Sequence, residues 1–287
     1  MLSLDFIIQQ TILGIMVGTL YAAISIGFSL SFGLARIINI AHAGFYALAA
    51  YLTYAFITIS DNFAFSIIFA SLIVCSFSFL VEKSLISKVY GKHIDLSLVI
   101  GFGILFMISS LIKYIWTPEP KSLSPPAILS GQFFIGRITI PVYYIFILIA
   151  SSCIYITTWI FVNKTMIGRT IKAGIDDLER VTLLGINISR IFTVNYVFSS
   201  FLAALGGGLM APLISLHPAI GHAIILIMFS IVVVGGMGSI FGTLVAGIIV
   251  GLSISYTAIY NPSIAEGVAY LLMIIVLLIK PEGLFKK

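Results

Sequence analysis

The sequence predicts an all-α protein, a polytopic transmembrane bundle with eight or nine spans, and three observations support this. Only 9% of the 287 residues are charged, against about 25% in an average soluble protein. Residues 191–265 form a run of 75 residues without Asp, Glu, Lys or Arg. At about 1.5 Å per helical residue this run spans roughly 110 Å, enough to cross a hydrocarbon core of about 30 Å three times. Continuous apolar runs favour helices over a β-barrel, whose strands alternate.

Uncharged runs and turn residues delimit the expected spans in chain order. The spans are expected near residues 8–33, 39–60, 63–81, 96–116, 141–162, 192–211, 223–235, 242–258 and 264–280. The piece at 223–235 is short for a complete crossing, and it is either a partial, re-entrant helix or a ninth span. Residues 1–287 are therefore expected to form a single transmembrane domain.

Basic residues collect in the connections on one side of the expected bundle. That side holds 12 of the 15 Lys and Arg residues, and the other holds only Lys113, Lys121 and Arg137. The twelve are Arg36, Lys83, Lys88, Lys92, Lys164, Arg169, Lys172, Arg180, Arg190, Lys280, Lys286 and Lys287. Cytoplasmic loops carry such an excess, so we expect a multi-pass protein of a bacterial cytoplasmic (inner) membrane. Nine spans would place the N-terminus outside and eight would place it inside. The net charge of +5 is interpreted as topology and contact with membrane lipid, with no nucleic-acid partner.

The expected outer loop, residues 117–140, contains four prolines. They are Pro118, Pro120, Pro125 and Pro126. Because proline removes a backbone donor, the loop is expected to be an irregular connector without a helical ladder. It either contributes to a docking surface or only joins two spans.

The charged loop at about 163–190 contains the strongest candidate for a binding surface. Asp176 followed by Glu179 is typical of a capping box that opens a helix, and Gly185 suits the stop of that helix. Leu178, Val181 and Leu184 recur at three-residue steps as an apolar stripe. A helix of about two turns is marginal alone, so its stripe needs a partner, either another protein or lipid headgroups. The candidate surface comprises Asp176, Asp177, Leu178, Glu179, Arg180, Val181, Leu184 and Gly185.

Several motifs together resemble one family. They are "LYAAISIGFSLSFGLARIINIAHAGFYALAAY", "GRTIKAGIDDLERVTLLGINISRIF", "VVGGMGSIFGTLVAGIIVG" and the ending "LLMIIVLLIKPEGLF". The chain resembles permease subunits of ABC importers for branched-chain amino acids, over nearly its whole length. The resemblance implies a second permease subunit, homologous or identical, two ATPase subunits and an extracytoplasmic solute-binding protein. The charged loop at 163–190 would then be the surface that couples to the ATPase.

The chain departs from many members of that family at one place. An acidic residue often follows "AHG" there, whereas this chain continues from His42 through Ala43 and Gly44 to Phe45. Branched-chain or other hydrophobic amino acids are the expected substrates, with urea, amides or sugars as alternatives in the same class. A secondary transporter not driven by ATP is a further alternative, although uncharged spans argue against strong ion coupling.

Glycines at four-residue steps predict close helix packing. The pairs are Gly14 and Gly18, Gly238 and Gly242, and Gly247 and Gly251. We expect each pair to place small residues on one helix face, so that a neighbouring backbone approaches closely.

Few polar side chains fall within the expected spans. Asn39 and His42 lie one turn apart at the start of the second span, where they either line a translocation path or act as a cap and an interfacial histidine. His217 and His222 have no acid or Cys nearby, so no metal site is expected. Glu266 opens the last span, where a negative charge is favourable.

The chain lacks a phosphate-binding loop. The segment "GQFFIGRIT" has Arg137 where a Walker A motif needs Lys and Ile138 where it needs Ser or Thr. The chain is therefore not expected to be an enzyme or to hold a cofactor of its own. If transport is driven by ATP, partner subunits bind the ATP.

Overall fold

The computed structural model describes residues 4–35 and 37–285, so Arg36, Lys286 and Lys287 of the basic set lie outside the described residues. The α-helices are α1 (Leu4–Ala35), α2 (Ala41–Ser60), α3 (Phe63–Ser84), α4 (Ile94–Trp116), α5 (Val142–Lys164), α6 (Met166–Asp176), α7 (Leu178–Leu183), α8 (Ile188–Met210), α9 (Ile220–Gly235), α10 (Ile240–Tyr260) and α11 (Gly267–Ile279). Short 3-10 helices are η1 (Ile86–Lys88), η2 (Ala127–Leu129), η3 (Ala211–Leu213) and η4 (Pro262–Ile264). Two strands, β1 (Gln132–Ile135) and β2 (Ile138–Pro141), pair antiparallel.

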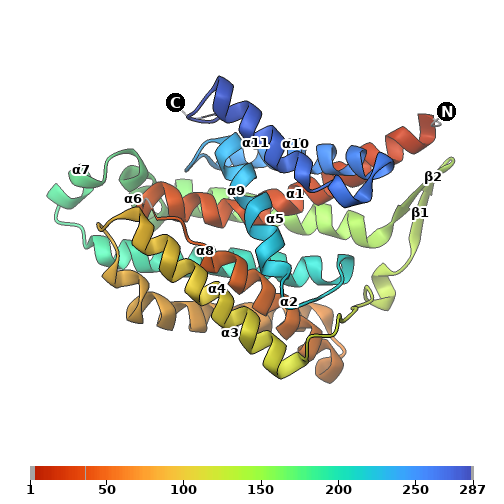
Figure 1. Cartoon of the computed structure of the whole chain (residues 1–287), viewed down its shortest axis with the longest axis horizontal. Helices are drawn as coiled ribbons and strands as arrows, with labels where there is room; N and C mark the ends of the chain where they lie inside the picture. Colours follow the sequence, from red (N-terminus) through yellow and green to blue (C-terminus); the bar gives the residue numbers. More distant parts are fainter. Residues whose placement is uncertain (1–3, 36, 286–287) are drawn as a thin grey trace.

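The nine expected spans all occur as apolar helices, which confirms the all-α transmembrane bundle. Seven helices are long and apolar enough to cross a membrane, and α9 and α11 are shorter apolar helices. In Figure 1 the start of α1 and the β1–β2 hairpin lie at one end of the bundle, called here the hairpin end. Helices α6 and α7 lie at the opposite end, called here the α7 end.

The short helix α9 completes a crossing with the help of non-helical backbone. Before α9, Leu216 exchanges two backbone hydrogen bonds of 2.8 Å with Lys121 in the loop at the hairpin end. Just before the end of α9, the Val234 carbonyl accepts a bond of 2.9 Å from the Leu284 amide. The chain therefore passes from the hairpin end to the α7 end between residues 214 and 235.

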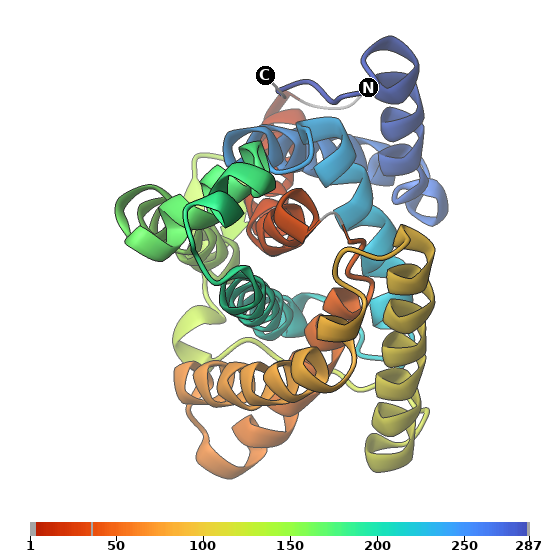
Figure 2. The same ribbon diagram turned by 90° about the vertical axis from the view of Figure 1, so that its left-hand side faces the viewer.

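Helix α1 occupies the middle of the bundle and packs most closely on α10. Figure 2, which looks along the longest axis, shows α1 surrounded by other helices. A Cβ added to Gly18 would lie 2.8 Å from the Gly247 carbonyl oxygen, and one added to Gly251 would lie 2.6 Å from the Gly14 carbonyl oxygen. Only glycine permits this approach of two backbones, so the α1–α10 interface is built on these four glycines.

The pair Gly238 and Gly242 does not share a helix face, contrary to the prediction. Helix α10 begins at Ile240, so Gly238 lies before the helix and Gly242 lies within it. Gly238 belongs to a turn, where its φ is +83°. Gly242 lies in the first turn of α10, where an added Cβ would collide with the Gly235 carbonyl of α9. The two glycines thus serve a tight turn and a helix contact separately.

Helices α2 and α9 both begin inside the bundle. Residues 37–39 are non-helical, and the α2 residue His42 bonds through Nε2 to the Ile24 carbonyl at 3.1 Å. Ile24 lies eleven residues from the end of α1, which is about 17 Å along that helix. A Cβ on Gly221 of α9 would lie 2.9 Å from the Ala43 carbonyl oxygen. The starts of the two helices therefore adjoin one another in the interior.

The loop at 117–140 contains structure that the proline content did not predict. Its second half forms the β1–β2 hairpin, which turns at Gly136 with φ +61°. Phe133, Phe134 and Ile135 of β1 are exposed. The expectation of an irregular connector holds for residues 117–126 but is wrong for residues 132–141.

Candidate functional site

Two adjoining helices form the charged segment at the α7 end, where the sequence predicted one. Thr165 caps α6 by accepting a hydrogen bond of 3.0 Å from the Gly168 amide. Asp177 caps α7 by accepting one of 3.1 Å from the Arg180 amide. The predicted capping box at Asp176 is wrong by one residue, because Asp176 still belongs to α6 and the extended backbone of Asp177 separates the helices. With Asp177 as the cap, the third helical position is Arg180, so Glu179 cannot complete a capping box.

The predicted apolar stripe of α7 divides between the body of the protein and its surface. Val181 is buried, and Leu178 packs in a cluster with Leu34 of α1 and Phe192 of α8. Leu184, by contrast, is 76% exposed, and its neighbour Leu183 is 81% exposed. A six-residue helix cannot turn three apolar residues toward a partner while it is also anchored to its own chain. Leu183 and Leu184 are therefore the apolar residues that α7 leaves open.

Charge and backbone geometry fix the rest of this surface. Arg180 Nε lies 2.6 Å from an Asp177 carboxylate oxygen in an exposed ion pair. Gly185 adopts φ +73° and its amide bonds to the Thr182 carbonyl at 3.0 Å, as the predicted stop requires. Glu179 is exposed beside them. The α7 surface, defined by Asp177, Glu179, Arg180, Leu183 and Leu184, thus presents two leucines bordered by charges.

Asn39 and His42 lie deep in the bundle. Both are buried, and the Asn39 side chain interacts with Tyr196 of α8. His42 Nε2 is held by Ile24, while its Nδ1 has no hydrogen-bond partner among the described residues. Neither residue lines a cavity described below. Their place on a translocation path stays a prediction.

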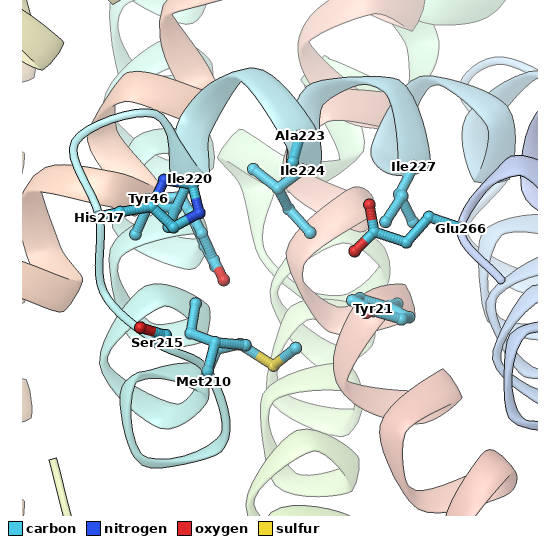
Figure 3. A pocket seen from close by; sticks show the side chains of 11 residues that line it. Tyr21, Tyr46, Met210, Ser215, His217, Ile220, Ala223, Ile224, Ile227 and Glu266 are labelled. Carbon is cyan, nitrogen blue, oxygen red and sulfur yellow. The ribbon is translucent and has the colours of Figure 1, made fainter. Parts of the chain in front are cut away.

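A cavity of about 280 Å³ lies toward the hairpin end, and Figure 3 shows its lining. It is called here the Glu266 cavity. Its lining residues are Tyr21, Tyr46, Met210, Ile214, Ser215, His217, Ile220, Ala223, Ile224, Ile227 and Glu266. They come from α1, α2, the end of α8, the segment before α9, α9 itself and the residue that precedes α11. The cavity therefore lies where the interrupted crossing meets α1 and α2.

One carboxylate and several other polar groups line this cavity. Glu266 interacts electrostatically with Tyr21 and Tyr46, and also with Tyr270 of α11. The side chains of Tyr21 and Tyr46 are buried and line the cavity, whereas Glu266 itself is exposed. In Figure 3 the Glu266 carboxylate points toward Tyr21 and Ile224, across the cavity from Tyr46 and His217. Tyrosine hydroxyls and a carboxylate that line one cavity can bind a small polar solute.

Sequence reasoning missed most of this cavity. It placed Glu266 at the start of the last span and noted His217, but it had no signal for Tyr21 and Tyr46, which look like ordinary apolar-run residues. The cavity joins residues up to 245 positions apart, from Tyr21 to Glu266. Only the fold brings them together.

A second missed residue is Glu82, which the sequence presents as a charge that ends a span. Its side chain is fully buried near the α7 end. Burial, and then the neighbouring Glu82 carboxylate, raise the pKa of Tyr90. Tyr90 in turn packs on Phe192, with ring centroids 4.4 Å apart, beside Leu178 of α7. Glu82 thus interacts with Tyr90, and Tyr90 packs on the apolar cluster that anchors α7 to the bundle.

Comparison with known proteins decides the family. The sequence model described as "Branched-chain amino acid transport system / permease component" matches residues 10–277. The chain belongs to this permease family. It is a multi-pass membrane protein, as the family and the nine apolar helices both indicate.

Individual relatives agree over the whole chain. The chain is 27% identical to the high-affinity branched-chain amino acid transport system permease protein BraD of Pseudomonas aeruginosa, over 96% of this chain and 95% of BraD. It is 25% identical to the corresponding protein LivH of Escherichia coli K12, over 97% and 95%. The structure of PsaBC from Streptococcus pneumoniae in complex with Fab covers 98% of this chain and 93% of its own, with 15% identity and a TM-score of 0.50. That last similarity concerns the fold alone.

Proposed function

We propose that this permease forms the translocation path for branched-chain or other hydrophobic amino acids in an ATP-driven importer. One observation carries the substrate class. BraD and LivH are branched-chain amino acid permeases by name, and each aligns with more than nine-tenths of this chain and of its own length. The Glu266 cavity supports the proposal because it offers a polar centre beside isoleucine side chains.

The partners we propose follow from what this chain lacks. Without a phosphate-binding loop it needs two ATPase subunits, and with a single bundle of apolar helices it would pair with a second permease subunit to enclose a path. A solute-binding protein would deliver the amino acid at the hairpin end. The α7 end would face the cytoplasm, because nine of the described basic residues belong to its connections.

The α7 surface is where we propose that the ATPase docks. Leu183 and Leu184 are exposed apolar residues on an aqueous loop, bordered by Asp177, Glu179 and Arg180. Leu178 anchors the same helix to α1 and α8, so closure of the ATPase dimer would move both helices. Such a movement between two packings is a common route from one access state to another.

Transport by the complete complex tests the function. The tagged chain would be purified with the subunits that copurify with it and reconstituted in liposomes with the binding protein encoded beside it. We expect ATP-dependent uptake of radiolabelled leucine, isoleucine or valine, and no ATP hydrolysis by the chain alone. Uptake without ATP would favour a secondary transporter. ATP hydrolysis by the purified chain, free of other ATPases, would refute the proposal that separate subunits hydrolyse the ATP.

A sugar permease is the second candidate, and one observation favours it. The ribose import permease protein RbsC of Escherichia coli K12 is 29% identical to this chain, over 56% of the chain and 53% of RbsC. The similarity covers about half of each protein, whereas the amino acid permeases align throughout. Radiolabelled ribose in the same liposomes decides between them, because uptake of ribose without leucine would overturn the amino acid assignment.

A further inference from the structure

The size of the Glu266 cavity limits its occupant to a small solute. Its volume of about 280 Å³ lies just below the roughly 300–1,000 Å³ typical of pockets for drug-sized ligands. A cavity of about 280 Å³ can hold a single amino acid, whereas a peptide or an extended lipid is too large for it. Ser215 and His217 are exposed at its rim, so the cavity is open to solutes in this structure.

The charge of the cavity indicates which part of a solute is recognised. Glu266 is its acid, and no Lys or Arg occurs among the lining residues. A carboxylate without a basic partner attracts a cationic group, and hydrogen bonds to a charged group are shorter and stronger than neutral ones. Tyr21 lies beside Glu266, Tyr46 lies across the cavity (Figure 3), and Glu266 is exposed. An ammonium group at Glu266 would satisfy the carboxylate.

The α9 side of the cavity supplies two further kinds of contact. Ile220, Ile224 and Ile227 present a nearly buried apolar wall on α9, which has 16 residues. The first of these residues is also the start of α9, so the positive end of that helix dipole faces the cavity. Together with the hydroxyl of Ser215 and the ring of His217 it suits a carboxylate.

From this arrangement we infer that the Glu266 cavity binds one zwitterionic amino acid, with its ammonium group at Glu266 and its apolar side chain against Ile224 and Ile227. The inference rests on the proposed function and deepens it by giving the chain its own recognition site. The carboxylate of the amino acid lies toward Tyr46 and the start of α9. Recognition of the solute is then shared between the binding protein and the permease.

Protection from thiol labelling tests this site directly. Cys75 and Cys153 would be replaced by serine, and Ser215→Cys would introduce a thiol at the rim of the cavity in the complete transporter. We expect L-leucine to slow labelling by N-ethylmaleimide, glycine to slow it less, and 4-methylpentanoate, which lacks the ammonium group, to slow it least. Glu266→Gln should raise the leucine concentration for half-protection about tenfold, which corresponds to about 1.4 kcal/mol of binding free energy.

Matched variants separate this site from general effects. Glu119→Gln removes an exposed acid at the same end of the bundle, outside the cavity, and should leave protection unchanged. A thiol at Ser124, in the exposed loop, should react at a rate independent of leucine. If Ser215→Cys prevents assembly, Ala223→Cys reports on the same cavity from α9.

The outcomes distinguish two failures. If the transporter takes up leucine but Glu266→Gln leaves protection intact, or 4-methylpentanoate protects as well as leucine, the ammonium site is wrong while the function stands. If the transporter with Glu266 takes up no hydrophobic amino acid at all, the proposed function is wrong and the inference falls with it.

Discussion

The Glu266 cavity and the α7 surface differ in the groups that they present to a partner. In the cavity, of about 280 Å³, two buried tyrosines and one exposed carboxylate face the same space. On the α7 surface the charged groups are paired or in water, and two leucines on a small helix are exposed. A small cavity with polar groups suits a small solute, and an exposed apolar edge with a charged border suits a protein. This difference underlies our proposal that the two ends of the bundle meet different kinds of partner.

Two helices connect these regions. Tyr21 of α1 lines the cavity and Leu34 of the same helix packs beneath α7, thirteen residues or about 20 Å away. Met210 and Phe192 occupy the corresponding places on α8. Helix α1 is also held to α10 by glycine contacts that leave little room for bending. We therefore expect whole helices to transmit a displacement at α7 to the cavity, and the following predictions test this comparison.

The largest effect concerns which end faces which compartment. Ser124→Cys lies in the loop at the hairpin end, and Ala173→Cys lies on α6 at the α7 end, and both positions are exposed. In intact cells an impermeant thiol reagent should label Ser124→Cys and leave Ala173→Cys unlabelled until the cells are permeabilised. The opposite pattern would invert the roles of the two regions.

Loss of the rigid connection should be nearly as severe. Gly251→Leu would place a side chain against the backbone of Gly14 and Gly18, and overpacking of this kind costs about 1–3 kcal/mol or more. We expect little folded protein in the membrane and a lower unfolding temperature in detergent. Gly103→Leu is the control, because an added Cβ at Gly103 on α4 meets nothing within 4 Å. Equal stability of the two variants would contradict the importance of the α1–α10 contact.

A charge on the α7 surface should separate docking from folding. Leu184→Asp leaves the bundle intact because the side chain is exposed, yet it buries an unpaired charge if an ATPase covers it. We expect loss of ATPase copurification and of uptake, with unchanged insertion. Thr182→Ser on the exposed face should be silent. An unchanged yield of ATPase with Leu184→Asp would remove the docking role from α7.

Two further variants on α7 sharpen the distinction between its faces. Val181→Asp should destabilise the permease itself, because Val181 is buried in its own chain. Gly185→Val should weaken coupling without unfolding the bundle, since a β-branched residue resists the φ of +73° at this position. If Val181→Asp instead matched Leu184→Asp in both stability and ATPase binding, the division between anchoring and docking residues would be wrong.

The sequence specified the bundle far better than either site. Long uncharged runs exceed the length that a soluble helix needs, so all nine apolar helices were predicted. The predicted close packing at Gly14, Gly18, Gly247 and Gly251 is also present, between α1 and α10. The predictions that were wrong or missing concern either one local choice of capping residue or contacts between distant residues. Asp176 and Asp177 are both good caps, and only the backbone shows that Asp177 is extended. The hairpin and the Glu266 cavity depend on contacts between distant residues, which no period in the sequence reveals.

A smaller effect distinguishes two tyrosines near the hairpin end, Tyr143, whose hydroxyl is hydrogen-bonded, and Tyr46, which lines the Glu266 cavity. The Tyr143 hydroxyl donates a buried bond of 2.6 Å to the Leu209 carbonyl, so Tyr143→Phe leaves an acceptor unpaired and should lower the free energy of unfolding by about 1–3 kcal/mol. Tyr46→Phe removes a hydroxyl from the lining of the Glu266 cavity and should cost little stability, but it should slow uptake. Thermal unfolding and uptake of both variants check this, and a stability loss confined to Tyr46→Phe would contradict it.

The smallest effect concerns the cap of α7. Asp177→Ala removes the acceptor of the Arg180 amide and should destabilise this helix by about 1 kcal/mol, without unfolding the bundle. Hydrogen exchange of the Arg180 amide should become about fivefold faster. Asp177→Asn keeps a capping oxygen but loses the ion pair with Arg180, so most of the protection should remain. Asp176→Ala, in α6, is the matched control, and faster exchange in that variant than in Asp177→Ala would return the cap to Asp176. Because the cap only positions Leu183 and Leu184, loss of ATPase binding in Asp177→Ala should be partial where Leu184→Asp is complete.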